Sequence, residues 1–342
     1  MATPKLKQLA LAVALAAAAG TASAELSVRD FFADAALSVD ALGVDGAGSG
    51  QLQVEAASGS TVLRAYLYAA SVWSGPVFGV NFNGTVLNTA AATTLTPNVN
   101  PATTVMWDVT ALVKPTIDGG GGGIYNFDLT ELGDNDGTVL VVVYSNASTV
   151  GGTAIVLDGE LATTGDTTTL NFASAYTTGD FIMSLASSFS YNGPPATGQV
   201  TTVDVQTSNN PASRRLTSCA GGNDDAVPPF ISDNGRLITA GGVGDDPSNP
   251  DPNCSVADQD DELYNLALGN SANASPFITA GDTFLRLLTR NPSNDDNVFG
   301  LFISSTFSIE DPTDPTVPEP ATLALAGLGL AGLAALRRRR KQ

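Results

Sequence analysis

Histidine is absent from the 342-residue chain, and cysteine occurs only twice. Without an imidazole there is no Ser-His-Asp or Cys-His catalysis, and the usual zinc ligand is missing. Lysine is also scarce. Between the two ends of the chain Lys114 is the only one, which leaves one candidate for Ser-Lys or Schiff-base chemistry. The composition therefore argues against most enzyme classes, and we expect a protein that is not an enzyme.

Positive charge is scarce in the body of the chain. Seven of the 15 basic residues lie at the two ends, so the segment between them holds eight basic and 34 acidic residues, a formal balance of −26. Such a surface repels nucleic acid and anionic lipid, and it favours solubility and divalent cations. We therefore expect no nucleic-acid partner.

The N-terminal segment has the three parts of a secretory signal peptide. Lys5 and Lys7 precede an apolar run over residues 9–19, and Ala-Ser-Ala at 22–24 supplies small residues for cleavage. We expect export through the Sec translocon and removal of the signal peptide, residues 1–24. An N-terminal membrane anchor is the alternative, but the apolar run is too short to span a bilayer.

The C-terminal segment combines two prolines, an apolar run and a basic cluster. Residues 317–320 are Val-Pro-Glu-Pro, residues 321–336 carry no charge, and five basic residues follow at 337–341. A helix over 321–336 would rise about 24 Å, slightly less than the ~30 Å hydrocarbon core of a bilayer. The pattern predicts a transmembrane helix over 321–336 whose basic end stays in the cytoplasm.

This arrangement resembles the PEP-CTERM sorting signal of Gram-negative bacteria. The residues that carry the resemblance are Val317, Pro318, Glu319, Pro320, Arg337, Arg338, Arg339 and Arg340. The resemblance implies recognition near Pro-Glu-Pro by exosortase, a membrane cysteine transpeptidase. It implies transient anchoring in the inner membrane, and then release to the cell surface or the extracellular matrix of a bacterium that makes exopolysaccharide and biofilm. A permanent single-span anchor is the alternative.

The body of the chain predicts an all-β fold. About twelve short runs rich in β-branched and aromatic residues are separated by turn signals, and the 35 glycines and 19 prolines are dispersed along the chain. We expect one or two antiparallel β-sandwich units of jelly-roll or immunoglobulin-like type. Helix is expected only in the signal peptide and in the transmembrane segment.

Three domain-sized segments are expected after the signal peptide. Residues 25–174 form a β-sandwich, residues 175–312 form a second β-rich unit with both cysteines and the acidic loops, and residues 313–342 hold a Pro-rich linker and the sorting signal. Residues 61–159 also resemble an uncharacterised family of β-sandwiches in secreted, matrix-associated bacterial surface proteins. That family implies no activity for the body.

Local patterns add more detailed predictions. We expect a hairpin over 77–88 with Asn83-Gly84 as its turn, and a strand over 103–113. Residues 134–137 predict a hairpin turn, and the apolar run that follows, up to residue 145, predicts a strand buried on both faces. Four apolar residues are expected in the core, and two aspartates are expected in turns: Leu67, Val141, Val143, Ile155, Asp108 and Asp158.

The two cysteines, Cys219 and Cys254, predict a disulfide because an exported chain meets an oxidising compartment. A disulfide that closes a loop of about 35 residues would stabilise the folded protein by about 3–4 kcal/mol in the chain-entropy model. The alternative is a pair of free thiols.

Acidic clusters between residues 221 and 300 suggest a Ca²⁺ site. Carboxylate and amide oxygens are the ligands that Ca²⁺ prefers. The candidate ligands are Asp258, Asp260, Glu262, Asp295 and Asn297. The spacing is not that of an EF-hand, since Leu263 stands at the sixth position where glycine is required. The alternative is that these residues build turns and confer solubility. No cofactor other than Ca²⁺ is suggested.

The sequence favours an exported cell-surface or biofilm-matrix protein that associates with extracellular polysaccharide through divalent ions. One alternative is a carbohydrate-binding module that stacks sugars on Trp73, Trp107, Tyr66, Tyr68 or Tyr191, although their place in apolar strands favours core packing. Another is a glycoside hydrolase, which needs two carboxylates about 5–10 Å apart. No feature of the sequence selects such a pair.

Overall fold

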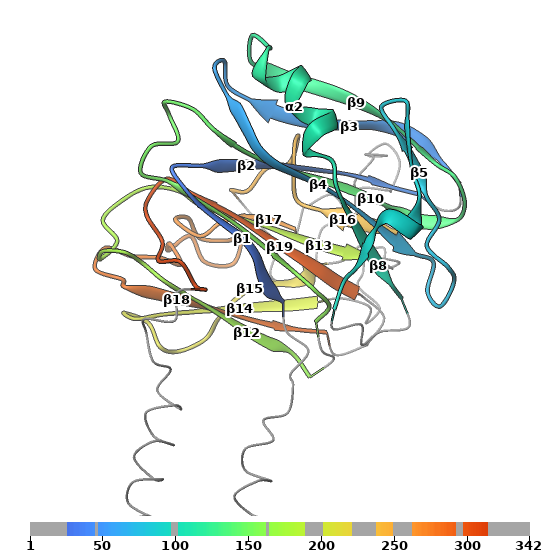
Figure 1. Ribbon diagram of the computed structural model, residues 1–342. Coiled ribbons are helices and arrows are strands. Elements are labelled where there is room, and N and C mark those ends of the chain that lie inside the picture. Colours follow the sequence, from blue (N-terminus) through green and yellow to red (C-terminus); the bar gives the residue numbers. More distant parts are fainter. Residues whose placement is uncertain are drawn as a thin grey trace, which may run out of the picture. The chain divides into compact units, whose positions relative to one another are not determined.

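The computed structural model describes residues 26–44, 47–96, 102–161, 164–188, 201–220, 237–248, 262–291 and 297–313. The chain divides into two units, residues 1–310 and 311–342, and every described strand belongs to the first (Figure 1). Among the described residues, no helix is long and apolar enough to cross a membrane. The signal peptide and the segment 321–336 lie outside the described residues.

The described part of the chain is built almost entirely of strands. These are β1 (Ser27–Ala33), β2 (Ala36–Gly43), β3 (Ser49–Ala56), β4 (Thr61–Ser71), β5 (Val80–Phe82), β6 (Thr85–Leu87), β7 (Thr93–Thr94), β8 (Thr104–Asp108), β9 (Gly123–Glu131), β10 (Asn135–Ser145), β11 (Thr153–Asp158), β12 (Asp166–Asn171), β13 (Phe181–Ser188), β14 (Thr201–Thr207), β15 (Arg214–Ala220), β16 (Ile238–Ala240), β17 (Leu263–Asn265), β18 (Phe284–Arg290) and β19 (Asn297–Ser305). An α-helix, α2 (Thr110–Asp118), and a 3-10 turn, η1 (Thr89–Ala91), lie between strands of the first half.

The strands form four antiparallel sheets. Sheet A has the order β1-β11-β19-β13-β16, with β17 also paired to β13, and sheet B has the order β2-β10-β4-β8-β7. Sheet C has the order β3-β9-β5-β6, and sheet D the order β12-β18-β14-β15. One apolar cluster joins D to A, a second joins A to B, and a third joins B to C and α2. The layers therefore follow the order D–A–B–C, which is two β-sandwiches packed through their inner sheets (Figure 1).

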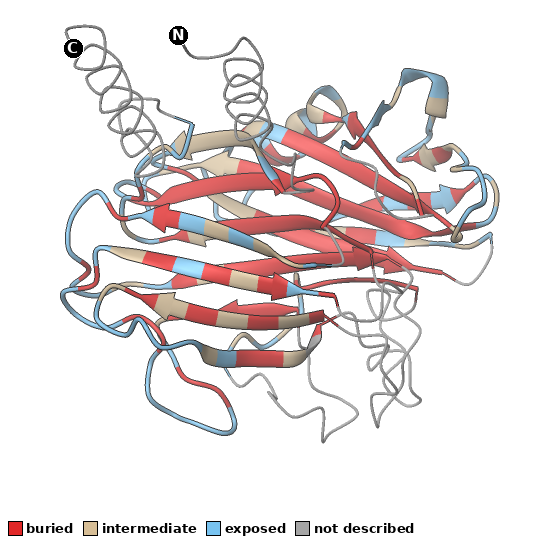
Figure 2. Cartoon of the chain, turned by 90° about the horizontal axis from the view of Figure 1, so that it is seen from below, coloured by how far each residue is buried: buried red, intermediate tan, exposed pale blue. Residues whose placement is uncertain are grey.

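The burial pattern of each strand reflects its layer. In β10, of inner sheet B, nine consecutive residues are buried, whereas β14, of outer sheet D, alternates between buried and half-buried residues. Figure 2 shows the difference, because the nearest strands alternate in colour while strands behind them are red along most of their length. A strand covered on both faces must be apolar at every position, and a strand covered on one face at every second position. The predictions of an all-β fold and of a β10 buried on both faces are confirmed.

The two inner sheets are joined by aromatic packing. The Tyr68 ring of β4 lies 5.9 Å from the Phe299 ring and 5.7 Å from the Phe302 ring of β19, centroid to centroid. Tyr68 is fully buried, and Trp107 on β8 is 4% exposed. The expected core residues Leu67, Val141, Val143 and Ile155 are fully buried too, so the prediction that these side chains form the core is confirmed.

The expected hairpin over 77–88 is confirmed. Strands β5 and β6 pair with each other, and the turn residues Asn83 and Gly84 have φ values of 47° and 82°. Positive φ at both central positions is the requirement of a type I′ turn, which explains the Asn-Gly pair.

The expected strand over 103–113 is wrong beyond residue 108, where the chain turns into α2. The Asp108 Oδ1 accepts the Thr110 N–H at 2.9 Å, and Lys114 pairs with Asp118 one turn later at 2.7 Å. Val113 and Ile117 are buried on one face of the helix, at the i, i+4 spacing that a helix requires. The hydrogen bond of Asp108 and the buried face of the helix prevail over the β-branched composition.

The expected hairpin turn at 134–137 is also wrong, because the strands on either side of it lie in different sheets. Strand β9 belongs to sheet C and β10 to sheet B. Asn135 is fully buried, accepts the Phe78 N–H at 2.8 Å and donates to Glu131 at 2.5 Å. These polar contacts fix the crossing from one layer to the next.

Strands from both sides of residue 174 share sheet A. Strands β1 and β11 precede that residue, and β13, β16 and β19 follow it. The division into 25–174 and 175–312 stays a prediction about which segments fold independently.

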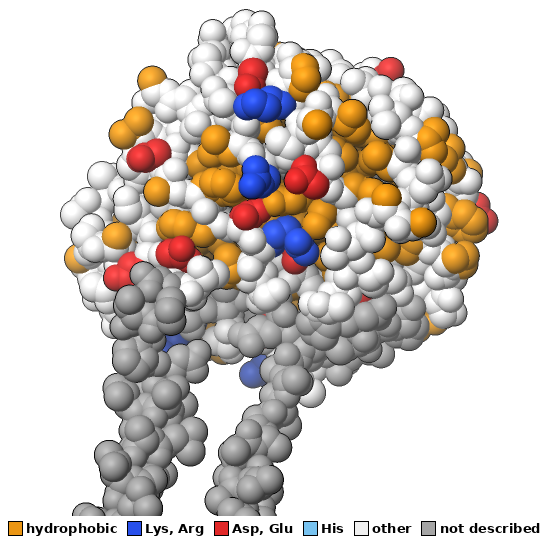
Figure 3. Space-filling view, in the orientation of Figure 1, with side chains coloured by type: hydrophobic (Ala, Val, Ile, Leu, Met, Phe, Trp, Pro, Cys, Tyr) orange, Lys and Arg blue, Asp and Glu red, His pale blue; other side chains and the backbone are white. Residues whose placement is uncertain are grey.

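Basic side chains are few on the described surface, and ion pairs join only some of the charged groups. In Figure 3, Lys and Arg side chains lie beside acidic ones, and apolar side chains are scattered between them in small groups. The three ion pairs among the described residues are Arg29–Asp158, Lys114–Asp118 and Arg215–Asp204. The large negative charge of the body is therefore not relieved by a large basic surface in the described region.

Candidate binding pocket

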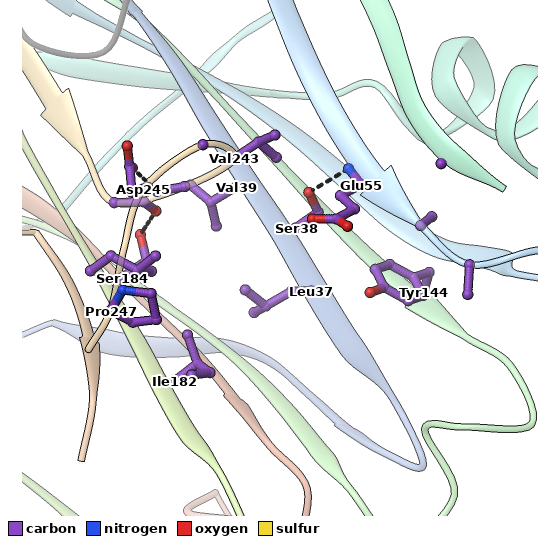
Figure 4. A pocket seen from close by; sticks show the side chains of 17 residues that line it. Leu37, Ser38, Val39, Glu55, Tyr144, Ile182, Ser184, Val243, Asp245 and Pro247 are labelled. Atoms are coloured by element: carbon purple, nitrogen blue, oxygen red, sulfur yellow. Dashed lines mark hydrogen bonds between the residues drawn. The ribbon is translucent and has the colours of Figure 1, made fainter. Parts of the chain in front are cut away.

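A cavity of about 510 Å³ lies at the edge of the junction between sheets A and B. On one side it is lined by Leu37 and Val39 of β2, the edge strand of sheet B, and by Tyr144 of β10. On the other side Ile182 of β13 and the loop 241–247 complete the wall (Figure 4). Its volume lies in the usual range of small-molecule pockets, about 300–1,000 Å³.

The loop that follows β16 is fixed against β2 by backbone contacts. The Val243 N–H donates to the Val39 carbonyl at 2.9 Å, and the Gly242 N–H donates to the Asp245 Oδ2 at 2.5 Å. A Cβ at Gly242 would lie 2.2 Å from the Val39 oxygen, so only glycine allows this approach. The wall of the cavity is thus formed before any ligand arrives.

The polar groups of the cavity are two carboxylates, a phenol and two serine hydroxyls. Glu55, at the end of β3, is exposed, while Tyr144 and Asp245 are half-buried. The Ser38 Oγ accepts the Glu55 N–H at 3.0 Å, and the Ser184 Oγ donates to the Gly241 carbonyl at 2.5 Å. Burial, and after it the charge of Glu55, raises the pKa of Tyr144. The phenol therefore stays neutral at physiological pH.

The candidate Ca²⁺ ligands are only partly described. Asp258, Asp260 and Asp295 lie outside the described residues. Glu262 is 2% exposed and Asn297 is 1% exposed. The Glu262 carbonyl accepts the Leu185 N–H of β13, whereas Asn297 pairs with Ser188 across the other edge of that strand. Within the described ranges, no three His, Cys, Asp or Glu side chains form a group that could hold a metal. The Ca²⁺ site stays a prediction.

The expected disulfide and sorting signal also fall largely outside the described residues. Cys219 contributes its backbone to β15, but its side chain and the whole of Cys254 are not among the described atoms. Residues 317–320 and 337–340 lie beyond residue 313, the last one described.

The aromatic residues considered for sugar stacking lie mostly in the core. Tyr66 is 6% exposed and packs with Tyr68 between sheets A and B, whereas Trp107 packs between sheets B and C. Trp73 is half-buried after β4 with a positive φ of 41°, and Tyr191 lies outside the described residues. The three core aromatics therefore offer no face to a sugar ring.

Two carboxyl groups with raised pKa lie away from the pocket. Burial raises the pKa of Glu131, which accepts hydrogen bonds from Asn135 and Thr138 between sheets B and C. Burial also raises the pKa of Asp166, which lines a separate cavity of about 360 Å³ with Arg290. The described lining of that second cavity contains no other carboxylate, so it shows no acid pair of the kind a glycosidase uses.

The residues of the pocket were not predicted from the sequence. Glu55, Tyr144 and Asp245 are separated by about 90 positions or more along the chain, and each follows or ends a strand with no local motif around it. The one local signal is Gly241-Gly242, two adjacent glycines whose Cβ positions are blocked by neighbouring backbone. Such a pair indicates a close backbone approach but not its chemistry.

Comparison with known proteins identifies the C-terminal segment. The family model described as the PEP-CTERM protein-sorting motif matches residues 316–340. No curated protein matches the chain. The crystal structure of the major capsid protein P2 from bacteriophage PM2 aligns with 81% of this chain and 99% of that chain, at 10% sequence identity and a TM-score of 0.20. A TM-score this low does not relate the two folds.

The family match confirms the resemblance drawn from the residues around Pro318 and the arginines that follow. A motif of this kind implies a protein that is exported and processed at the membrane by exosortase. The chain is thus an exported β-sandwich protein that carries a PEP-CTERM protein-sorting motif at residues 316–340.

Proposed function

We propose that the chain is a non-enzymatic protein of the cell surface or biofilm matrix of a Gram-negative bacterium. The observation that carries this proposal is the sorting motif at residues 316–340. In this proposal the Sec translocon exports the chain, and the apolar segment 321–336 holds it in the inner membrane for a short time. Exosortase then cleaves near Pro-Glu-Pro and releases the body to the surface, where extracellular polysaccharide is its partner.

The layered body supports a scaffolding function rather than a catalytic one. Sheets A and B are covered on both faces, and an apolar cluster fills each of the three interfaces between the layers. Densely packed β-layers resist unfolding and proteolysis, as an extracellular component must. The absence of histidine from the sequence and the engagement of the pocket serines Ser38 and Ser184 with backbone groups further favour a protein without nucleophilic catalysis.

The charge of the body supports association through divalent ions. With eight basic and 34 acidic residues in the body, direct contact with an acidic polysaccharide is repulsive unless cations lie between them. Carboxylates of both partners can coordinate the same Ca²⁺ ion. Attachment to the matrix should therefore weaken when Ca²⁺ is chelated.

The test is a triple substitution in the motif, Pro318→Ala, Glu319→Ala and Pro320→Ala, expressed in the native host. It leaves the apolar segment 321–336 and the basic cluster intact, so insertion into the inner membrane should persist while cleavage stops. Cell fractionation should then show a longer form accumulating in the membrane. The wild-type body should leave the membrane in a shortened form.

A matched control replaces Pro312, Asp314 and Pro315 with alanine. The control also replaces two prolines and one acidic residue of the same Pro-rich linker, but these residues precede the matched range. This variant should be processed like wild type. If wild-type cells contain only the full-length chain, the proposal fails in favour of a permanent anchor. If the control blocks release as strongly as the motif variant, release does not depend on recognition of Pro-Glu-Pro and the proposal fails as well.

A further inference from the structure

The charged side chains of the pocket beside β2 are all of one sign. Its described lining includes the carboxylates of Glu55 and Asp245 and no Lys or Arg. The two acidic residues come from different parts of the chain, the end of β3 and the loop after β16, and in Figure 4 they lie on different sides of the cavity. An anionic ligand would meet two like charges, whereas a cation would meet two opposite ones.

The surface between the carboxylates is apolar. Leu37 lies near the middle of the view in Figure 4, with Val39 and Ile182 on either side of it. Val243 and Pro247 extend this surface along the loop. A ligand that fits must therefore combine its charge with a hydrocarbon part, because a small hydrated ion would leave the apolar wall uncovered.

Tyr144 adds a third feature that suits a cation. Its ring is half-buried beside the cavity, and the charge of Glu55 acts on its phenol. A neutral phenol ring attracts an ammonium or guanidinium group through its π face. The carboxylate and the ring therefore favour the same sign of charge at the same end of the cavity.

The cavity is preformed, so binding has little ordering cost. The loop 241–247 is fixed by the contacts of Val243 with Val39 and of Gly242 with Asp245. Leu263, next to β13, is held by the pairing of β17 with that strand. A rigid wall of this kind loses little conformational entropy when a ligand enters.

We propose that this pocket binds a small organic cation, an amine with an apolar carbon body. The ammonium group lies toward Glu55 and Tyr144, and the carbon body lies on Leu37 and Ile182. This site would add a ligand to the body that the sorting motif neither requires nor explains.

The test uses three probes of the same shape, 4-phenylbutylamine, 4-phenyl-1-butanol and 4-phenylbutanoate, which are cationic, neutral and anionic at pH 7. Each is titrated by calorimetry into the exported protein purified from the cells that make it, in about 0.15 M salt so that exposed charges are screened beyond about 8 Å. The amine should bind at least tenfold more tightly than the alcohol, and the anion should not bind. Equal affinity of the amine and the alcohol would overturn the proposal.

Two variants locate the site. Glu55→Gln should weaken amine binding about three- to tenfold. Asp128→Asn removes another exposed carboxylate of sheet C, on β9 outside the cavity, and should leave amine binding unchanged. Equal weakening by both variants would mean attraction to the acidic body as a whole, and it would refute the pocket.

A third variant, Ile182→Lys, places a competing ammonium group at the cavity wall. It should abolish amine binding while both carboxylates remain. An unchanged melting temperature would show that the variant is folded. If the folded variant still binds the amine like wild type, the ligand does not occupy this cavity.

Discussion

Replacing Arg29 with methionine should strongly destabilise the body, because Arg29 neutralises a carboxylate inside the protein. Arg29 donates to both oxygens of Asp158, whose side chain is 4% exposed, and Tyr68 adds a third hydrogen bond at 3.0 Å. Burial alone would lower the pKa of Arg29, yet the hydrogen bond and the charge of Asp158 raise it overall. Asp158 therefore stabilises the charged form of Arg29 by more than burial destabilises it.

The register of β1 explains how Arg29 reaches this position. Val28 pairs with Leu157 and Asp30 pairs with Val156, so Arg29 is an extra residue in a β-bulge. A bulge redirects a side chain without breaking the sheet. The same local shift places Asp30 beside Tyr66, whose hydroxyl donates to it.

The expected loss of stability follows from the contacts that Asp158 keeps after the substitution. Arg29→Met leaves a buried carboxyl group that has lost its cationic partner and keeps the hydrogen bond from the Tyr68 hydroxyl, a change that typically costs about 3–5 kcal/mol. Because the Arg29 side chain is 24% exposed, we expect a loss near the lower end, about 3 kcal/mol. The double variant Arg29→Met, Asp158→Asn removes the charge but keeps an acceptor for Tyr68, so it should recover about 2 kcal/mol of that loss.

Urea unfolding of wild type, the single variant and the double variant at pH 7 gives the differences in free energy of unfolding from the transition midpoints. Comparable m-values show that the fold is unchanged. A loss below about 1 kcal/mol in Arg29→Met, or a double variant as unstable as the single one, would refute the reasoning.

Three further predictions concern other parts of the body. Burial raises the pKa of Glu131 in the folded protein. Its contribution to stability is therefore complete below the pKa of the group in the unfolded chain, and it is lost as the pH rises through the pKa of the group in the folded protein. In paired urea titrations, wild type should lose stability relative to Glu131→Gln between pH 4 and pH 7. Mass spectrometry of the unreduced exported protein should show one linked peptide pair containing Cys219 and Cys254, and two freely alkylated thiols would contradict this. Ca²⁺ at 100 times its dissociation constant should add about 2.7 kcal/mol and raise the melting temperature. Identical melting curves in EDTA and in millimolar Ca²⁺ would leave the acidic clusters as turn and solvation residues.

The sequence predicts well those features that depend on neighbouring residues. The apolar run before Ser145 can only belong to a strand covered on both faces, and β10 is such a strand. The Asn83-Gly84 turn follows in the same way, because few other residue pairs tolerate two positive φ values. The fold class and the local turns are therefore encoded in short segments of the sequence.

The errors arise where a distant contact decides the local structure. Asp158 was expected in a turn because aspartate favours turns, but it lies buried in β11 opposite Arg29, 129 residues earlier in the chain. The turn over 134–137 was expected to close a hairpin, but the contact of Asn135 with Phe78 directs the chain into another sheet. Neither partner can be found from the local sequence.

The pocket is a consequence of the layered architecture and could not be predicted for the same reason. Inner strands that are apolar on both faces require a second sandwich to cover them, and the cluster between sheets A and B supplies that cover. Sheets twist, so two packed sheets cannot stay in contact at every edge. At the edge formed by β2 the loop 241–247 takes the place of a neighbouring strand, bonding to Val39 through Val243 and leaving Leu37 exposed to the cavity. The site therefore exists because an apolar cluster joins the two sandwiches through their inner sheets. Its acidic character is set by Glu55 and Asp245, which the fold brings to that edge from about 190 positions apart.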